Sequence, residues 1–318
     1  MAIDPTKEAM KQNQRPGSAT PPRAVSPNLQ CYECGKLFMS TANVADLYVL
    51  DMAGVCPACS AKLDWWKLAY RMVERNFMLT AAFQILGAKQ TIFTTKVFLN
   101  TITLFDLYQE GLPANAKILD VNLSPEHMFC TELNTNVRRM RNKGGELQLL
   151  GFQTDTDLQN PDEGIVHIFV TWVETSVDDA AWTNLVLAFD YYADKNYEAS
   201  LVPANVAVEY RLFQFVEQQF ANITSQQRVK DFLESAATYS HQLNILLPFI
   251  ARQLNAPIMP TDPRGRLNRL RDLRNLVAHH GRCDPPLTNA DGAELVTAAL
   301  FGFRYLGILA ARAAECQT

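Results

Sequence analysis

Two cysteine pairs with the same internal spacing constrain the fold of this chain more than any other feature of its sequence. They are Cys31-Tyr-Glu-Cys34 and Cys56-Pro-Ala-Cys59, separated by residues 35–55. A Cys-x-x-Cys pair places two thiolates on one tight turn, and two such turns supply the four sulfur ligands of a tetrahedral zinc site. Gly35 follows the first pair, where such a turn commonly needs a residue that tolerates positive φ. The predicted ligands of this zinc ribbon are Cys31, Cys34, Cys56 and Cys59.

Two other uses of these cysteines fit the sequence less well. Two disulfides would suit a secreted protein, but no apolar signal core is found near the N-terminus. A redox site would need one Cys-x-x-Cys pair, and this sequence has two matched pairs. Four thiolates leave no open coordination position, so the expected Zn²⁺ is structural and replaces a core that about 35 residues cannot build. The other cysteines, Cys130, Cys283 and Cys316, are expected to be free thiols, which suits a reducing compartment.

Composition places the chain among packed globular proteins. Of its 318 residues 48% are hydrophobic and 19% charged, which argues against a disordered, collagenous or coiled-coil protein. The net charge of −4 argues against a uniformly basic nucleic-acid binder, although it leaves room for local basic patches. Because no run reaches the roughly 18 apolar residues of a membrane helix, we expect a soluble, cytoplasmic protein with no membrane partner.

The pattern changes three times along the chain, which predicts four segments and a multidomain α+β fold. Residues 1–29 are rich in proline and nearly devoid of large apolar side chains, so we expect a disordered segment. Residues 30–76 would form the zinc ribbon and a linker helix, because apolar residues recur at helical spacing from Leu63 to Val73. Residues 77–177 are expected to be β-rich, and residues 178–318 helical.

The middle segment alternates apolar and polar residues with a period of two. In Ile165–Val173 one strand face is wholly apolar, and turn residues separate the alternating runs. We predict an antiparallel β domain, either a sandwich or an open barrel. His167 lies opposite the apolar face and is expected to be a structural histidine. Arg138, Arg139 and Arg141 form a basic run, which could contact phosphates or simply occupy a solvated hairpin tip.

The last segment reads as an antiparallel bundle of five helices. The first begins after Asp178, and the second is expected to start at Pro203. The third would begin with a capping box at Thr224–Gln227 and continue to Leu254. The fourth is expected to run from an N-cap at Asp262 to Gly281. The fifth would begin near residues 288–289.

The fourth predicted helix carries the candidate catalytic and nucleic-acid-binding residues. Six arginines lie between Arg264 and Arg282, a density able to hold a polyanion, and the helix ends in His279-His280. Metal-free RNA cleavage needs a proton acceptor, a proton donor and fixed positive charge at the phosphorus, which histidine and arginine supply. The predicted nucleic-acid-binding residues are Arg138, Arg139, Arg141, Arg266, Arg269, Arg271 and Arg282.

Helical geometry limits how Arg274 and His279 can cooperate. They are five residues apart, so on one straight helix their side chains diverge by about 140°. Either the helix breaks at the histidines, or two copies of it meet across a symmetric interface and share the site.

The string Arg271-Asp-Leu-Arg274-Asn275-Leu-Val-Ala-His279-His280-Gly281 resembles the signature of the HEPN superfamily. That resemblance covers residues 178–318 and implies a HEPN-like helical bundle with metal-independent endoribonuclease activity at a homodimer interface. It implies that Arg274 and His279 are catalytic and that Asn275 supports them, with His280 also within the family's spacing. It further implies RNA as substrate, a toxin or antiviral-defence setting, and an antitoxin or defence-system partner.

Two alternatives from different functional classes remain. Exposed arginines are ordinary, and histidines at a helix C-terminus interact favourably with the helix dipole, so the bundle could be a non-catalytic dimerisation and binding scaffold. The β domain could instead sense a small ligand.

Overall fold

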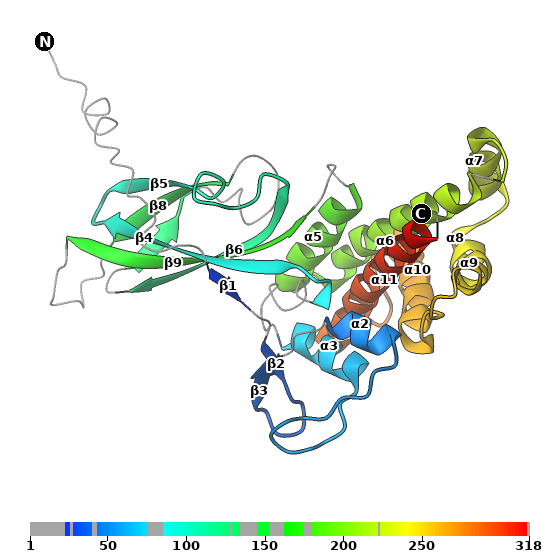
Figure 1. The fold of residues 1–318 in the computed structure, drawn as a ribbon, viewed down its shortest axis with the longest axis horizontal. Coiled ribbons are helices and arrows are strands. Elements are labelled where there is room, and N and C mark those ends of the chain that lie inside the picture. Colours follow the sequence, from blue (N-terminus) through cyan, green and yellow to red (C-terminus); the bar gives the residue numbers. More distant parts are fainter. Residues whose placement is uncertain are drawn as a thin grey trace, which may run out of the picture. The chain divides into compact units, whose positions relative to one another are not determined.

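The computed structural model describes residues 23–25, 28–39, 43–75, 85–126, 129–133, 145–152, 162–174, 180–221 and 223–316. It divides the chain into two compact units (Figure 1). The β unit comprises residues 88–177 and the N-terminal residues up to Val25, and the helical unit comprises residues 26–87 and 178–318. The predicted α+β chain with antiparallel sheets and a C-terminal helical region is confirmed.

Two antiparallel sheets are formed by the described residues of the β unit. A four-stranded sheet has the order β1-β4-β9-β6, and a three-stranded sheet has the order β5-β8-β7. Their bounds are β1 Arg23–Val25, β4 Lys89–Phe98, β5 Ile102–Asp106, β6 Ala116–Glu126, β7 Phe129–Glu132, β8 Glu146–Phe152 and β9 Glu163–Glu174.

One hydrophobic core joins the inner faces of these two sheets, as in a sandwich. Phe93 of β4 contacts Phe105 of β5 edge to face, with ring centroids 5.9 Å apart. The apolar face expected on β9 is buried at Val166, Ile168, Val170 and Trp172. In β6 the strict alternation breaks, because the register shifts between Ile118 and Asp120.

The N-terminal strands differ from the expectation of disorder over residues 1–29. Arg23–Val25 pairs with β4, and Asn28–Gln30 forms strand β2 in the helical unit. Strand β1 gains its backbone hydrogen bonds from a partner distant in sequence, which composition does not reveal, whereas β2 pairs in a local hairpin with residues 37–39. Residues 1–22 lie outside the described part of the chain.

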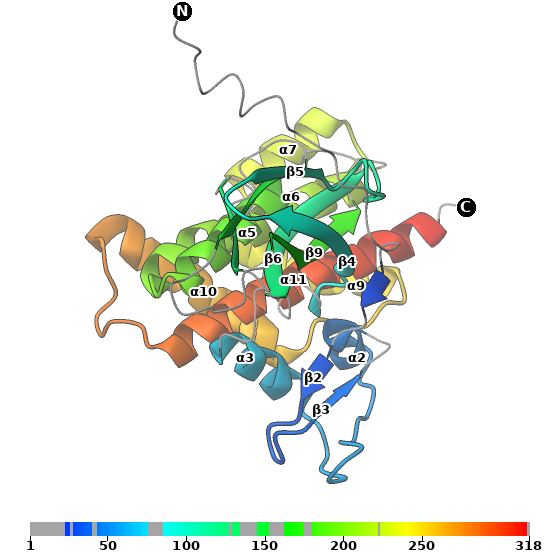
Figure 2. The ribbon, with the colours of Figure 1, turned by 90° about the vertical axis from the view of Figure 1, so that its left-hand side faces the viewer.

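The helical unit begins with the cysteine module, residues 28–39 and 43–75. It contains β2, which pairs with β3 Leu37–Met39, and helices α2 Val44–Val49 and α3 Trp65–Glu74. Asp64 caps α3 by accepting from the Lys67 backbone N–H. Trp65 and Trp66 are both buried, as expected for core residues. The β2–β3 hairpin lies on the side of α2 and α3 away from α11 (Figures 1 and 2).

The remaining helices form the bundle. They are α5 Ala180–Ala193, α6 Tyr197–Phe220, α7 Gln226–Ser235, α8 Tyr239–His241, the π-helical turn η1 Gln242–Leu246, α9 Leu247–Gln253, α10 Thr261–His280 and α11 Asn289–Glu315. Helix α11 packs against α6, α10 and α3. It is the one helix in the described ranges that is long and apolar enough to cross a membrane, but it is mostly buried, like the core helix of a soluble protein.

Three predicted helix starts are wrong, and the third, at Asp262 of α10, is described with the candidate site below. Helix α6 begins at Tyr197, so Pro203 lies inside it rather than in its first turn. Asn196 caps the earlier start by accepting from the Ala199 backbone N–H. The predicted third helix begins after Ser225 with no side-chain cap hydrogen bond, and it is interrupted after Ser235. The capping box at Thr224–Gln227 therefore does not form.

The cysteine module is attached to α11 by aromatic packing and one ion pair. Trp66 and Tyr48 contact the ring of Phe301 edge to face, with centroids 5.2 and 5.5 Å away. Arg304 donates two hydrogen bonds to the Asp46 carboxylate, at 2.7 and 2.6 Å. These contacts explain why residues 26–87 belong to the same compact unit as the bundle.

Candidate functional site

The four predicted cysteine ligands converge in the cysteine module. Their sulfur atoms all lie within 4.8 Å of one another. The Cys31 and Cys59 sulfurs are 3.9 Å apart, and those of Cys34 and Cys56 are 3.8 Å apart. A tetrahedron with metal–sulfur bonds of about 2.3 Å has edges of about 3.8 Å, so the thiol positions fit one metal ion.

The two cysteine turns share one hydrogen-bond pattern. Gly35 N–H donates to the Cys31 carbonyl and Ser60 N–H to the Cys56 carbonyl, each at 2.9 Å. Both Gly35 and Ser60 have positive φ, of 72° and 59°. The expectation of positive φ after the first pair is thus met, and the second turn reaches it without glycine.

Hydrogen bonding at Cys56 favours the thiolate that a metal ion requires. Desolvation acts to raise the pKa of the Cys56 thiol, but hydrogen bonds from backbone and neighbouring thiols outweigh it and lower the pKa to about 7. One of these donors is the Ala58 backbone N–H, 3.4 Å from the sulfur. At Cys59 a hydrogen bond from the Ala61 backbone acts to lower the thiol pKa, but desolvation and hydrogen bonds with the other thiols outweigh it and raise the pKa. Of these two thiols Cys56 therefore loses its proton more readily, as a metal ligand must.

The second candidate site lies on α10, which is continuous through both histidines. Its end is closed at Gly281, whose φ is 76° and whose N–H donates to the Val277 carbonyl at 2.8 Å. At its start the N-cap is Pro260, and Asp262 lies in the first turn instead of capping it. The helix therefore does not break at His279.

The arginines of α10 have different partners. Arg266 pairs with Glu294 of α11 at 2.7 Å, and Arg269 pairs with Asp291 of α11 at 2.8 Å. These two predicted nucleic-acid-binding residues thus hold α10 against α11. Among the described residues Arg271 forms an ion pair only with the adjacent Asp272, whose side chain is 61% exposed. Arg282 is exposed just beyond the helix.

Arg274 points toward α6 instead of toward the histidines. Its Nη2 lies 4.0 Å from Glu209 Oε2 of α6, and its Nη1 donates to Asn275 Oδ1 at 3.0 Å. His279 and His280 are both exposed, with ring centroids 6.5 Å apart. One copy of α10 therefore does not bring Arg274 and His279 together, as the helical geometry predicts.

The sequence did not predict Glu209, the carboxylate near Arg274, or the polar residues that interact with Glu209. Asn205 of α6, fully buried, donates to Glu209 Oε2 at 3.0 Å. Tyr239 of α8 is buried, which raises the pKa of its phenol, and Glu209 raises it further. These residues come from α6 and α8, so no local motif near Arg274 could have identified them.

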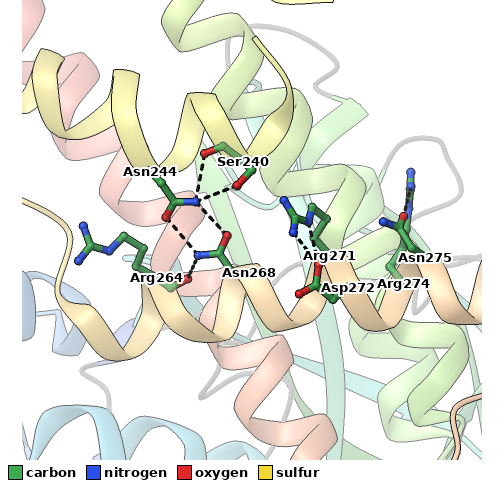
Figure 3. A network of polar contacts seen from close by, with 8 residues as sticks. All are labelled: Ser240, Asn244, Arg264, Asn268, Arg271, Asp272, Arg274 and Asn275. Carbon is green, nitrogen blue, oxygen red and sulfur yellow. Dashed lines mark hydrogen bonds and ion pairs between the residues drawn. The ribbon is translucent and has the colours of Figure 1, made fainter. Parts of the chain in front are cut away.

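A second polar cluster joins α10 to the π-helical turn (Figure 3). Asn244 Nδ2 donates to Asn268 Oδ1 at 3.0 Å, and Asn268 Nδ2 donates to Asn244 Oδ1 at 3.1 Å. Asn244 also donates to the Ser240 carbonyl, and Asn268 to the Arg264 carbonyl.

In the β unit, His167 has two polar partners, as a structural histidine should. It contacts Thr94 Oγ1 through Nδ1 and Glu126 Oε1 through Nε2, each at 3.0 Å. The predicted basic run of Arg138, Arg139 and Arg141 lies outside the described residues.

Comparison of the chain with protein-family models, with curated proteins and with solved structures gives no match.

Proposed function

We propose that this protein is a metal-independent endoribonuclease of HEPN type that acts inside the cell as a homodimer. The observation that carries the proposal is the arrangement of α10. One unbroken helix directs Arg274 toward Glu209 of α6 and places His279 about 140° away around the helix axis, on the face that also carries Asn275. A symmetric pair of such helices can bring the arginine of one copy to the histidine of the other.

The chemistry assigned to these residues requires no metal. The ribose 2′-oxygen attacks the adjacent phosphorus as its proton passes to a neutral histidine. The bond from phosphorus to the 5′-oxygen of the next nucleotide breaks as that oxygen takes a proton from a protonated histidine, which leaves a 2′,3′-cyclic phosphate and a 5′-hydroxyl. Arg274 stabilises the negative charge that develops on the phosphorane, and Asn275 orients the guanidinium through its side-chain oxygen. His279 is the first choice for proton transfer, with His280 adjacent.

The four-cysteine cluster is assigned a structural Zn²⁺. Cys31, Cys34, Cys56 and Cys59 would bind the ion, and its role is to fix the two turns of a zinc ribbon. The β unit is assigned recognition of an activating signal, an antitoxin or another defence-system partner. The toxin or antiviral setting follows from the HEPN resemblance alone.

One observation favours a second candidate function, a non-catalytic dimerisation and binding scaffold. Two arginines of α10 are neutralised by carboxylates of α11, and Arg274 is directed toward Glu209. A bundle with these pairings would remain folded without any catalytic role.

An RNA-cleavage assay in EDTA separates the two functions. The endoribonuclease cuts transfer or messenger RNA, and Arg274→Ala and His279→Ala each lower the rate at least about 100-fold. His241→Ala, which removes an exposed histidine from α8, is the matched control and retains activity. Circular dichroism verifies that the variants and the chelated protein stay folded. Cutting that survives both substitutions contradicts the assignment, and a folded wild type that never cuts RNA favours the scaffold.

A further inference from the structure

One face of α10 carries arginine and asparagine side chains in alternation. Arg264, Asn268, Arg271 and Asn275 occupy positions i, i+4, i+7 and i+11, so they follow one line along the helix (Figure 3). We call these four residues the polar track. All four are partly exposed, and Asn275 is in direct contact with Arg274. The polar track therefore ends at the proposed catalytic arginine.

The π-helical turn supplies a further amide beside the polar track. Asn244 faces Asn268 in a reciprocal pair of amide hydrogen bonds, and both side chains remain accessible from solvent. The N–H groups of both amides are already used, because Asn244 also donates to the Ser240 carbonyl and Asn268 to the Arg264 carbonyl. Each side-chain oxygen keeps one lone pair, which can accept a hydrogen bond from an exocyclic amino group of a nucleobase. Such π-helical turns occur often at functional sites.

Charge distinguishes the polar track from the opposite flank of α10. Within the described ranges no carboxylate forms an ion pair with Arg264, and Arg271 meets only its exposed neighbour Asp272. On the other flank, Arg266 and Arg269 are each neutralised by a carboxylate of α11. Positive charge available for a ligand is therefore concentrated on the polar track.

We propose that the polar track binds the backbone of single-stranded RNA and leads it to Arg274. Arg264 and Arg271 contact phosphates, and the side-chain oxygens of Asn244 and Asn268 accept hydrogen bonds from amino groups of the bases. Seven residues of helix separate the two arginines by about 10 Å, which corresponds to about three nucleotides at stacked spacing. The inference rests on the proposed function, because it concerns the substrate of that site. An acidic protein segment would use the arginines but would leave the paired amides without a role.

The test measures the salt dependence of RNA binding by the His279→Ala protein, which leaves the probe uncut. A fluorescent single-stranded RNA of mixed sequence is titrated at several salt concentrations. Each phosphate contact contributes about 0.7 to the slope of log affinity against log salt. Arg264→Gln and Arg271→Gln should each reduce the slope by about that amount and weaken binding about fourfold at 150 mM salt. Asn268→Ala should weaken binding equally at every salt concentration.

Arg266→Gln on the same helix and Arg312→Gln on α11 are the matched controls, and both should retain the wild-type slope. If all four arginine substitutions reduced the slope equally, binding would reflect diffuse electrostatic attraction, and the proposed role of the polar track would be overturned. If wild-type protein cuts RNA but Arg264→Gln and Arg271→Gln bind normally, the polar track alone is wrong. If folded protein neither binds nor cuts RNA, the proposed function fails as well. Competition by polyglutamate as strong as that by RNA of equal charge would point to an acidic protein partner and overturn the inference.

Discussion

At the scale of single residues, the arginines of α10 differ by the carboxylate that each one meets. Arg266 and Arg269 are held by α11, Arg274 lies near Glu209 of α6, and Arg264 has no ion-pair partner among the described residues. Buried or shared carboxylates convert an arginine into a structural residue, whereas an uncompensated one can bind a phosphate. The six arginines are therefore not one uniform patch.

The cysteine cluster gives a prediction at this same scale. We expect one Zn²⁺ per chain, and Cys56→Ser should lower this to near zero because three thiolates bind the ion much more weakly than four. Elemental analysis of purified protein measures the ratio. Cys130→Ser, outside the cluster, is the matched control and keeps the metal. Folded wild-type protein that carries no zinc would contradict the assignment.

The spacing of the four cysteines could predict their cluster, because each pair lies in one local turn that is closed by its own backbone hydrogen bond. Spacing along the chain could also place Arg274 and His279 on one helix and show that they diverge. It could not predict Glu209 near Arg274, nor Asn205 and Tyr239 around Glu209, since these residues are brought together by tertiary packing of α6 and α8. Nor could it separate paired from unpaired arginines, whose partners lie elsewhere in the sequence.

At the scale of secondary-structure elements, helix ends were predictable where the capping groups are close in sequence. Gly281 ends α10 in a left-handed conformation, and Thr288 begins α11 with a complete capping box. Thr224 has the same kind of sequence signal, yet α7 begins after Ser225 without a side-chain cap. Capping motifs state a local preference, which the packing of the bundle can override.

Asp291 provides a test of how the start of α11 is stabilised, because it belongs to the capping box of α11 and also accepts a hydrogen bond from Arg269. A hydrogen bond from Thr288, together with Arg269, holds the pKa of the Asp291 carboxyl below its usual value. The resulting stability is present at neutral pH and is lost as pH falls through the lowered folded-state pKa. Asp291→Asn should therefore cost about 1 kcal/mol at pH 7. Its difference from wild type should shrink toward zero below pH of about 4.

Urea unfolding of Asp291→Asn and wild type, at pH 7 and below pH of about 4, measures this difference in the free energy of unfolding. Asp272→Asn, an exposed carboxylate on α10, should cost much less at pH 7 and serves as the control. A cost at Asp291 that stays constant between the two pH values would show that the charged cap does not stabilise α11.

At the scale of the whole molecule, the cysteine module and the bundle are one compact unit, while the β sandwich is another. Composition suggested a separate ribbon, because nothing in residues 30–76 reveals that Tyr48 and Trp66 pack on Phe301. Arg304 adds a two-point contact to Asp46. The fold of the cysteine module is therefore linked to that of α11.

This linkage predicts that metal loss destabilises the bundle. Chelation should lower the midpoint of helical unfolding by at least about 3 °C, since about 1 kcal/mol shifts the midpoint by 2–4 °C in proteins of this size class. Circular dichroism at 222 nm follows the helices during heating. The Cys56→Ser protein should have the lower unfolding midpoint even without chelator, and adding chelator should not change that midpoint. An unchanged midpoint after verified zinc removal would show that the module and the bundle unfold independently.

The central claim is a metal-independent RNA-cleaving site shared between two copies of α10. The most direct measurement mixes the inactive Arg274→Ala and His279→Ala proteins, allows subunits to exchange, and assays RNA cleavage in EDTA. Half of the dimers then contain one of each variant, and each of these holds one complete arginine–histidine pair. Activity should therefore return to about a quarter of the wild-type value. A mixture that exchanges subunits yet remains inactive, while wild type cuts RNA, would contradict the shared site.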